Sequence, residues 1–174
     1  MVEAALRKIS PGVTNQIPFA HSLGRPPVIS SEEAAKSVRV DHMLIRLLYD
    51  ELNQESVKTF AIRPWFHERL IGHQIYLSVF FYDQNNNPIP ALRKDFTGGQ
   101  NLAAASMSWA LERKDLVPDD NNPRILRVPS SAIRSEAENA PQPETVRLFV
   151  YDLTDRTSLF EKDYPLDGEF ILNR

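Results

Sequence analysis

The sequence contains no cysteine, and this absence excludes several kinds of chemistry at once. Without thiols the protein forms no disulfide framework, uses no thiol nucleophile and binds no zinc through cysteine. A chain of 174 residues is nevertheless long enough to bury a hydrophobic core without such cross-links. We therefore expect one domain that is held together by packing.

Glycine is scarce, with 6 residues against 13 prolines, and long apolar runs are missing. Proline interrupts helices and restricts central strands, so the composition predicts many short segments joined by loops. No run approaches the roughly 18 apolar residues that span a bilayer. The first residues also lack the basic region and apolar core of a secretory signal. A cytoplasmic protein is expected on these grounds, and membrane binding is not.

A marked excess of charge is absent too, because the formal net charge is −3. Such a charge gives no general electrostatic reason to bind nucleic acid. Catalytic patterns are also missing: there is no Gly-x-Ser-x-Gly elbow, and Gly98 and Gly99 lack the lysine of a phosphate-binding loop. The sequence therefore predicts a protein without catalytic residues or a cofactor.

The strongest positive signal is the run of residues 75–82, Ile-Tyr-Leu-Ser-Val-Phe-Phe-Tyr. Side chains alternate between the two faces of a strand, and here both faces are apolar apart from Ser78. A strand of this kind belongs in the middle of a sheet that is covered on both sides. The polar residues 83–88 that follow predict a surface turn.

Residues 31–52 fit two patterns. Five positions match the spacing of an amphipathic helix: Val40, Met43, Leu44, Leu47 and Leu48. The same segment also alternates from Val38 onwards, as a strand would. We expect a helical turn over residues 30–36 and then a strand over residues 38–49, with a helix over the whole segment as the alternative.

Further short strands are expected along the rest of the chain. They cover residues 57–66, 91–96, 102–111, 124–128 and 146–151, with a closing hairpin of residues 159–164 and 169–172. One more helical turn is expected over residues 132–137. Seven or eight short strands separated by turns predict a mainly β fold. The expected architecture is an antiparallel β-sandwich of immunoglobulin-like or C2-like type, formed by residues 31–174.

Residues 1–30 contain four prolines, two glycines and scattered apolar residues without a helical or strand period. They predict an extended N-terminal arm, and a disordered tail is the alternative. Phe19 and Ile29 would be unfavourable in water. Both are therefore candidate contacts with a partner or with the body of the protein.

Three aromatic residues are further candidates for binding. Trp65 and Phe66 lie in a connection after Pro64, and Trp109 lies among small residues. Tryptophan is enriched at interaction hot spots, which makes these residues candidates for contact with a partner. Burial in the core is the favoured interpretation for all three.

Acidic residues at strand ends are candidate metal ligands. The set comprises Asp83, Asp119, Asp120, Asp152 and Asp155. Loop carboxylates of this kind bind calcium when about six or more oxygens converge, and residues 83–87 and 151–155 are similar to loops of C2 domains in general character. The favoured interpretation is that aspartate and asparagine occur there because they form turns.

His67 and His73 form a separate candidate, because they lie six residues apart and flank Glu68. Their spacing matches neither a helical zinc motif nor a zinc finger. Histidines in loops without a specific role are the favoured interpretation. A hydrolase that uses both histidines with acidic partners is the alternative.

The absence of a catalytic pattern, the modest charge and the apolar arm together favour a binding function. We expect a non-enzymatic β-sandwich that binds another protein or further copies of itself, as a component of a larger complex. The alternative is a calcium-dependent, C2-like module that binds a membrane or a ligand.

Overall fold

A computed structural model describes residues 31–118, 123–137, 139–167 and 169–171. The strands are β1 (Val38–Asp50), β2 (Glu55–Phe66), β3 (Gln74–Tyr82), β4 (Ala104–Ala110), β5 (Arg124–Pro129), β6 (Thr145–Asp152), β7 (Thr157–Pro165) and β8 (Glu169–Ile171). The α-helices are α2 (Ser31–Ala35) and α3 (Ser130–Ile133). Single 3-10 turns are η2 (Glu68–Leu70), η3 (Lys94–Phe96), η4 (Gly99–Asn101) and η5 (Arg113–Asp115).

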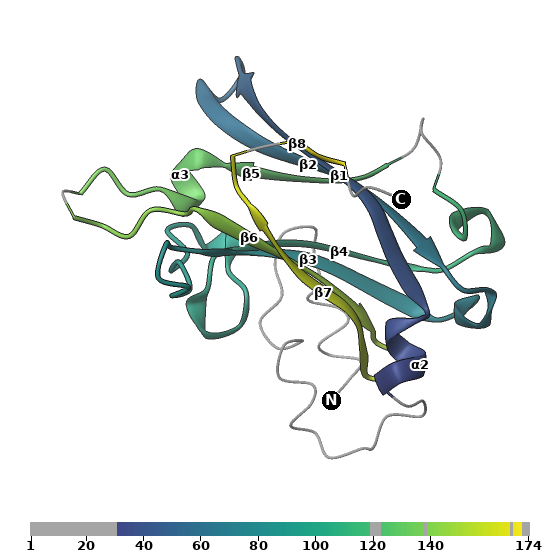
Figure 1. The fold of residues 1–174 in the computed structure, drawn as a ribbon. Coiled ribbons are helices and arrows are strands. Elements are labelled where there is room, and N and C mark those ends of the chain that lie inside the picture. Colours follow the sequence, from purple (N-terminus) through teal and green to yellow (C-terminus); the bar gives the residue numbers. More distant parts are fainter. Residues whose placement is uncertain (1–30, 119–122, 138, 168, 172–174) are drawn as a thin grey trace.

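These strands form two four-stranded antiparallel sheets, which Figure 1 shows as two layers. Sheet A has the order β5-β2-β1-β8, and sheet B has the order β4-β3-β6-β7. Apolar side chains from both sheets form one core between the layers. The predicted mainly β fold, a two-sheet antiparallel sandwich with two short helices, is confirmed.

β3 lies in the interior of sheet B, between β4 and β6. Four of its side chains point into the core between the sheets: Ile75, Leu77, Val79 and Phe81. The ring of Phe81 lies 5.8 Å from that of Phe60 in sheet A, measured between centroids. On the opposite face of the strand, Tyr76 is buried as well. Each such side chain contributes about 1.5–3 kcal/mol to the stability of the fold when it is buried away from water. The predicted enclosed strand is confirmed.

β1 shows why residues 31–52 matched two patterns. Its pairing with β2 shifts between Val40 and His42, which leaves Asp41 as the extra residue of a β-bulge. The bulge moves the alternation by one position, so Val40 and Met43 are both buried in the core although they are three residues apart. A spacing of three is also typical of a helix face. The strand prediction is confirmed, and the bulge explains the helical alternative.

The prediction of a strand over residues 91–96 is wrong. This segment contains η3, where Arg93 Nη2 donates to Asp95 Oδ2 at 2.8 Å. Thr97 Oγ1 donates to the carbonyl oxygen of Arg93 at 3.1 Å. These short-range hydrogen bonds stabilise a turn in place of the ladder that a strand requires.

The prediction of a closing hairpin between residues 159–164 and 169–172 is also wrong. β7 pairs with β6 in sheet B, whereas β8 pairs with β1 in sheet A. Between them, the side chain of Leu166 is buried in the core. The Nζ of Lys58 donates to the carbonyl oxygen of Leu166 at 3.4 Å, which fixes the crossing between the two sheets.

Two buried tyrosines predict an alkaline limit to the stability of the fold. Burial raises the pKa of both Tyr151 and Tyr164 to about 12, because a buried phenolate would lose its hydration. Both tyrosines ionise near pH 10 in the unfolded chain, whereas the folded protein keeps their protons until about pH 12. Their contribution to the free energy of unfolding is therefore complete below about pH 10 and is lost as the pH rises to about 12. We expect the free energy of unfolding in urea to fall on the order of 2 kcal/mol per tyrosine over that range.

The variant Tyr151→Phe should remove about half of this fall, since one of the two phenols is then absent. Ionisation is followed by absorbance at 295 nm in the folded protein. If all five tyrosines of the chain ionise together near pH 10 while the protein is folded, the prediction is wrong.

Candidate functional site

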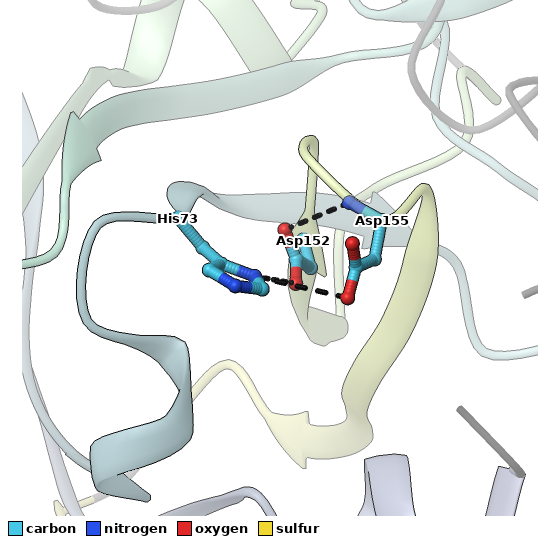
Figure 2. A group of neighbouring side chains, drawn as sticks. All are labelled: His73, Asp152 and Asp155. Atoms are coloured by element: carbon cyan, nitrogen blue, oxygen red, sulfur yellow. Dashed lines mark hydrogen bonds and ion pairs between the residues drawn. The ribbon is translucent and has the colours of Figure 1, made fainter. Parts of the chain in front are cut away.

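One polar cluster of the described residues has the composition of a metal site: His73, Asp152 and Asp155 (Figure 2). His73 immediately precedes β3, Asp152 ends β6, and Asp155 lies in the turn that leads to β7. β3 and β6 are antiparallel neighbours, and the pairing of Ile75 with Asp152 brings the histidine next to both carboxylates. The fold therefore joins two of the predicted metal ligands with one of the two predicted histidines.

Asp152 is the centre of this cluster and is fully buried. Its Oδ2 lies 2.7 Å from Nδ1 of His73. Its Oδ1 accepts hydrogen bonds from the backbone N–H of Thr154 at 2.9 Å and of Asp155 at 3.2 Å. A carboxylate can only accept, so the imidazole proton lies on Nδ1. The carboxylate of Asp155 is more distant, with its Oδ2 3.8 Å from the same Nδ1.

The ligand atoms of the three residues lie within 4.8 Å of one another. One nitrogen and two carboxylates suit a cation of the zinc class better than calcium, which takes about six to eight oxygens. A cation would have to displace the proton on Nδ1 of His73 and compete with the hydrogen bonds that Asp152 already accepts. As they stand, these bonds connect the β6–β7 turn to the start of β3.

A second pair of bonds strengthens that connection. The backbone N–H of Gln74 donates to Thr154 Oγ1 at 2.9 Å, and the N–H of Leu153 donates to the carbonyl oxygen of Gln74 at 2.8 Å. The cluster thus lies within a network that holds the turn against the neighbouring strand. The geometry of the cluster therefore supports a structural role, in which it holds the β6–β7 turn against the start of β3.

Of the predicted calcium ligands that the structure describes, Asp83 lies apart from Asp152 and Asp155. Asp83 follows β3 at the end opposite His73, so the nine residues of the strand separate the two by about 30 Å. Hydrogen bonds from the backbone and side chain of Asn87 lower the pKa of Asp83, and the N–H of Asn85 donates to the same carboxylate. Asp83 therefore forms a turn. The other two predicted ligands, Asp119 and Asp120, lie outside the described residues.

Phe66 and Trp109 belong to the body of the sandwich. Phe66 is 1% exposed, and its ring meets that of Trp109 edge-on at 6.0 Å between centroids. The guanidinium of Arg124 lies 4.3 Å from the centre of the Trp109 ring and donates to Asp115 at 2.6 Å. Both aromatic side chains are therefore engaged within the protein, as the favoured interpretation of core burial predicts.

Two further candidates, His67 and Trp65, lie apart from the cluster. His67 is the cap residue that precedes η2, and its side chain accepts a hydrogen bond from the backbone N–H of Arg69. Its ring lies edge-on to half-buried Trp65, 6.3 Å away. In the described chain His67 is not part of the His73 cluster. The other two predicted binding residues, Phe19 and Ile29, lie outside the described residues.

Sequence reasoning missed a group of exposed apolar residues near the end of the β1–β2 hairpin. The exposed fractions are 61% for Leu47, 50% for Leu48, 63% for Tyr49 and 91% for Leu52, and we call these four residues the tip patch. Figure 1 shows the hairpin, in blue, extending past β5 and β8 at the upper left. The signal in the sequence is that apolar residues continue after Arg46, on both faces of the strand, up to a polar loop.

Among the described residues, the edge of β1 beside the tip patch is open. β2 pairs with one side of β1 along its length, whereas β8 pairs with the other side only at residues 42–44. Within the described part of the chain, residues 45–50 therefore have no neighbouring strand on that side. An open edge with apolar side chains around it is a template for a further strand.

We expect Asp152→Ala to lower the free energy of unfolding by about 3 kcal/mol, because it removes three hydrogen bonds and leaves their donors without an acceptor. The matched control is Asp155→Ala, because the carboxylate of Asp155 makes only a longer contact, of 3.8 Å, with the imidazole of His73. This variant should lose less than about 1 kcal/mol. Denaturant titrations with and without a chelator measure both losses. Equal losses, together with destabilisation of the wild type by the chelator, would indicate a bound cation instead.

Comparisons of the chain with protein-family models, with curated proteins and with solved structures gave no match. Among the residues that the structure describes, no helix is both long enough and apolar enough to cross a membrane. Two local features therefore bear on function: the His73 cluster, and the tip patch with its open edge.

Proposed function

We propose that this protein is a non-enzymatic assembly protein that binds a second copy of itself through the open edge of β1. The observation that carries this proposal is the tip patch beside that edge. Apolar surface in contact with water is unfavourable by roughly 25 cal/mol per Å², so a partner that covers these side chains gains free energy. The main-chain groups of the open edge supply the hydrogen bonds for a further strand.

The edge of β1 is complementary to itself. In a two-fold antiparallel pair, each residue and its partner lie at equal distances from the axis, and identical surfaces meet. An axis at Leu48 pairs this residue with Leu48 of the second copy, Leu47 with Tyr49, and Arg46 with Asp50. An axis at Leu47 would instead place each arginine opposite a leucine and leave the charges unpaired.

The favoured register places matching side chains on each face. Arg46, Leu48 and Asp50 alternate along one face of β1, and Leu47 and Tyr49 along the other. One face of the pair therefore carries two arginine–aspartate pairs around a leucine pair, and the other carries two leucine–tyrosine pairs. Cross-strand pairs of these kinds contribute about 0.2–1 kcal/mol each.

The charge that this register requires on Asp50 is present in the single chain. Hydrogen bonds from the side chain and backbone of Asn53, together with the N–H of Leu52, lower the pKa of Asp50. The carboxylate is therefore ionised at neutral pH, where it attracts Arg46 of the second copy. The surface area buried by this contact is small compared with the roughly 1,200–2,000 Å² of stable complexes. We therefore expect reversible association in the micromolar range.

A single cysteine tests the register directly. The two Cα atoms of the Leu48 pair would lie about 4.5–5.5 Å apart, which is within the range of a disulfide. The chain has no cysteine of its own, so a linked dimer of Leu48→Cys reports this contact alone. In Tyr49→Cys, the matched control, the Cα atoms would lie about 8 Å apart, too far to be linked. We expect a disulfide-linked dimer on non-reducing gels for Leu48→Cys and little for Tyr49→Cys.

Sedimentation equilibrium measures the same association without a cross-link. Leu48→Lys places two like charges opposite each other and should weaken the dimer at least about tenfold. Leu92→Lys is the matched control, because Leu92 has a similar exposure of 48% but lies outside the hairpin. A wild-type protein that stays monomeric up to millimolar concentration, or equal linking of both cysteine variants, would contradict the proposal.

A further inference from the structure

A third feature of the described chain is a pocket that lies where β2 ends and β5 begins. Its volume is about 150 Å³, comparable with that of an engineered protein cavity that holds a benzene molecule. Its apolar wall is formed by Ile62, Pro64, Phe66, Val117 and Pro118. A pocket of this size and lining suits a ring or a short alkyl chain that carries one polar group.

Arg124 and Asp115 form the polar side of the pocket. Arg124 Nη2 donates to Asp115 Oδ1 at 2.6 Å, and the other oxygen of Asp115 accepts from the backbone N–H of Glu112 at 2.9 Å. The guanidinium also lies 4.3 Å from the centre of the Trp109 ring, and the side chain of Arg124 is only 23% exposed. These contacts hold a partly buried cation in a fixed orientation beside the apolar wall.

The pocket offers more hydrogen-bond donors than acceptors. A guanidinium carries N–H donors on each of its nitrogens, and within the described chain the side chain of Arg124 donates only to Asp115. Both oxygens of Asp115 already accept a bond. Lys114 lines the pocket as well, and its ion pair with Glu112 is exposed. An exposed pair of this kind is weak, so the ammonium remains accessible to an incoming anion.

We propose that this pocket binds a small carboxylate with an apolar body. The carboxylate accepts from the N–H groups of Arg124 that Asp115 does not use, in the paired geometry that a guanidinium favours. The apolar body lies against the wall that Val117 and its neighbours form. A phosphate lacks the body that this wall requires, and an amine would meet the like charge of Arg124. None of the lining residues belongs to β1, so the proposal is independent of the self-association described above.

Titration of the ¹⁵N-labelled full chain with sodium benzoate, at constant ionic strength, tests the proposal. We expect saturable chemical-shift changes at the backbone amides of Lys114, Val117 and Arg124, with a dissociation constant on the order of a millimolar. Benzamide is the matched control, because it has the same ring without the charge, and it should bind at least about tenfold more weakly. Inorganic phosphate should also bind more weakly, because it leaves the apolar wall uncovered. Absence of saturable changes at these amides with benzoate, or equally tight binding of benzamide or phosphate, would overturn the proposal.

Substitutions at the pocket separate charge from shape. Val117 is 67% exposed, so neither Val117→Asp nor Val117→Asn should disturb the core. The aspartate places a negative charge beside the ligand and should weaken benzoate binding about tenfold, whereas the asparagine, which has a similar shape, should change it less than about threefold. Arg124→Lys keeps the charge but loses the planar set of donors, and it should weaken binding at least about fivefold.

Unfolding curves in urea establish that each variant is folded before it is titrated. Val117→Asp decides the test if Arg124→Lys does not fold, because its side chain lies at the exposed rim. Benzoate binding to folded Val117→Asp as tight as to the wild type would overturn the proposal.

Discussion

A strand that is apolar on both faces has to be covered on both faces, and β3 imposes this requirement on the rest of the protein. Its inner side chains pack against sheet A, where the ring of Phe60 meets that of Phe81. Its outer side chains join those of β6 in a second apolar cluster. Both clusters are buried in the folded chain. The β6–β7 turn is attached to the start of the same strand through Asp152.

Acidic residues at the ends of strands have a common role in this fold. Asp50, Asp83 and Asp152 each accept hydrogen bonds from backbone N–H groups two to four residues further along the chain. The hydrogen bonds to Asp50 and Asp83 lower the pKa of both carboxylates. The carboxylates thus stabilise turns, which explains their position at strand ends without a metal ion. The hairpin that Asp50 closes is also the one that carries the tip patch.

The sequence predicts best those elements whose side chains repeat with a simple period. Residues 75–82 are an example, since alternation and apolar content both indicate an enclosed strand. β1 was harder to predict, because one extra residue at Asp41 changes the period within the strand. The path from β7 to β8 was predicted wrongly, because the choice of sheet depends on contacts such as that of Lys58 with Leu166, 108 residues apart.

In the candidate site, too, the sequence predicts some residues and leaves others to contacts between distant parts of the chain. Asp152 and Asp155 were predicted as ligands from their position at a strand end, but His73 lies 79 residues before Asp152 and meets it only through strand pairing. The exposure of the tip patch could not be predicted either. Leu47 and Leu48 continue an apolar run that is buried up to Ile45, and only the position where neighbouring strands end decides which part is covered.

Hydrogen exchange of the folded monomer, resolved to single amides, tests the central place of β3 most directly. We predict that the ladder amides of β3 exchange only through global unfolding, with the free energy that denaturant titration gives. Amides of residues 45–50 on the open side of β1 should exchange far faster, because no described strand protects them. Exchange of β3 amides at a lower free energy than those of sheet A would contradict the view that the enclosure of this strand holds the sandwich together.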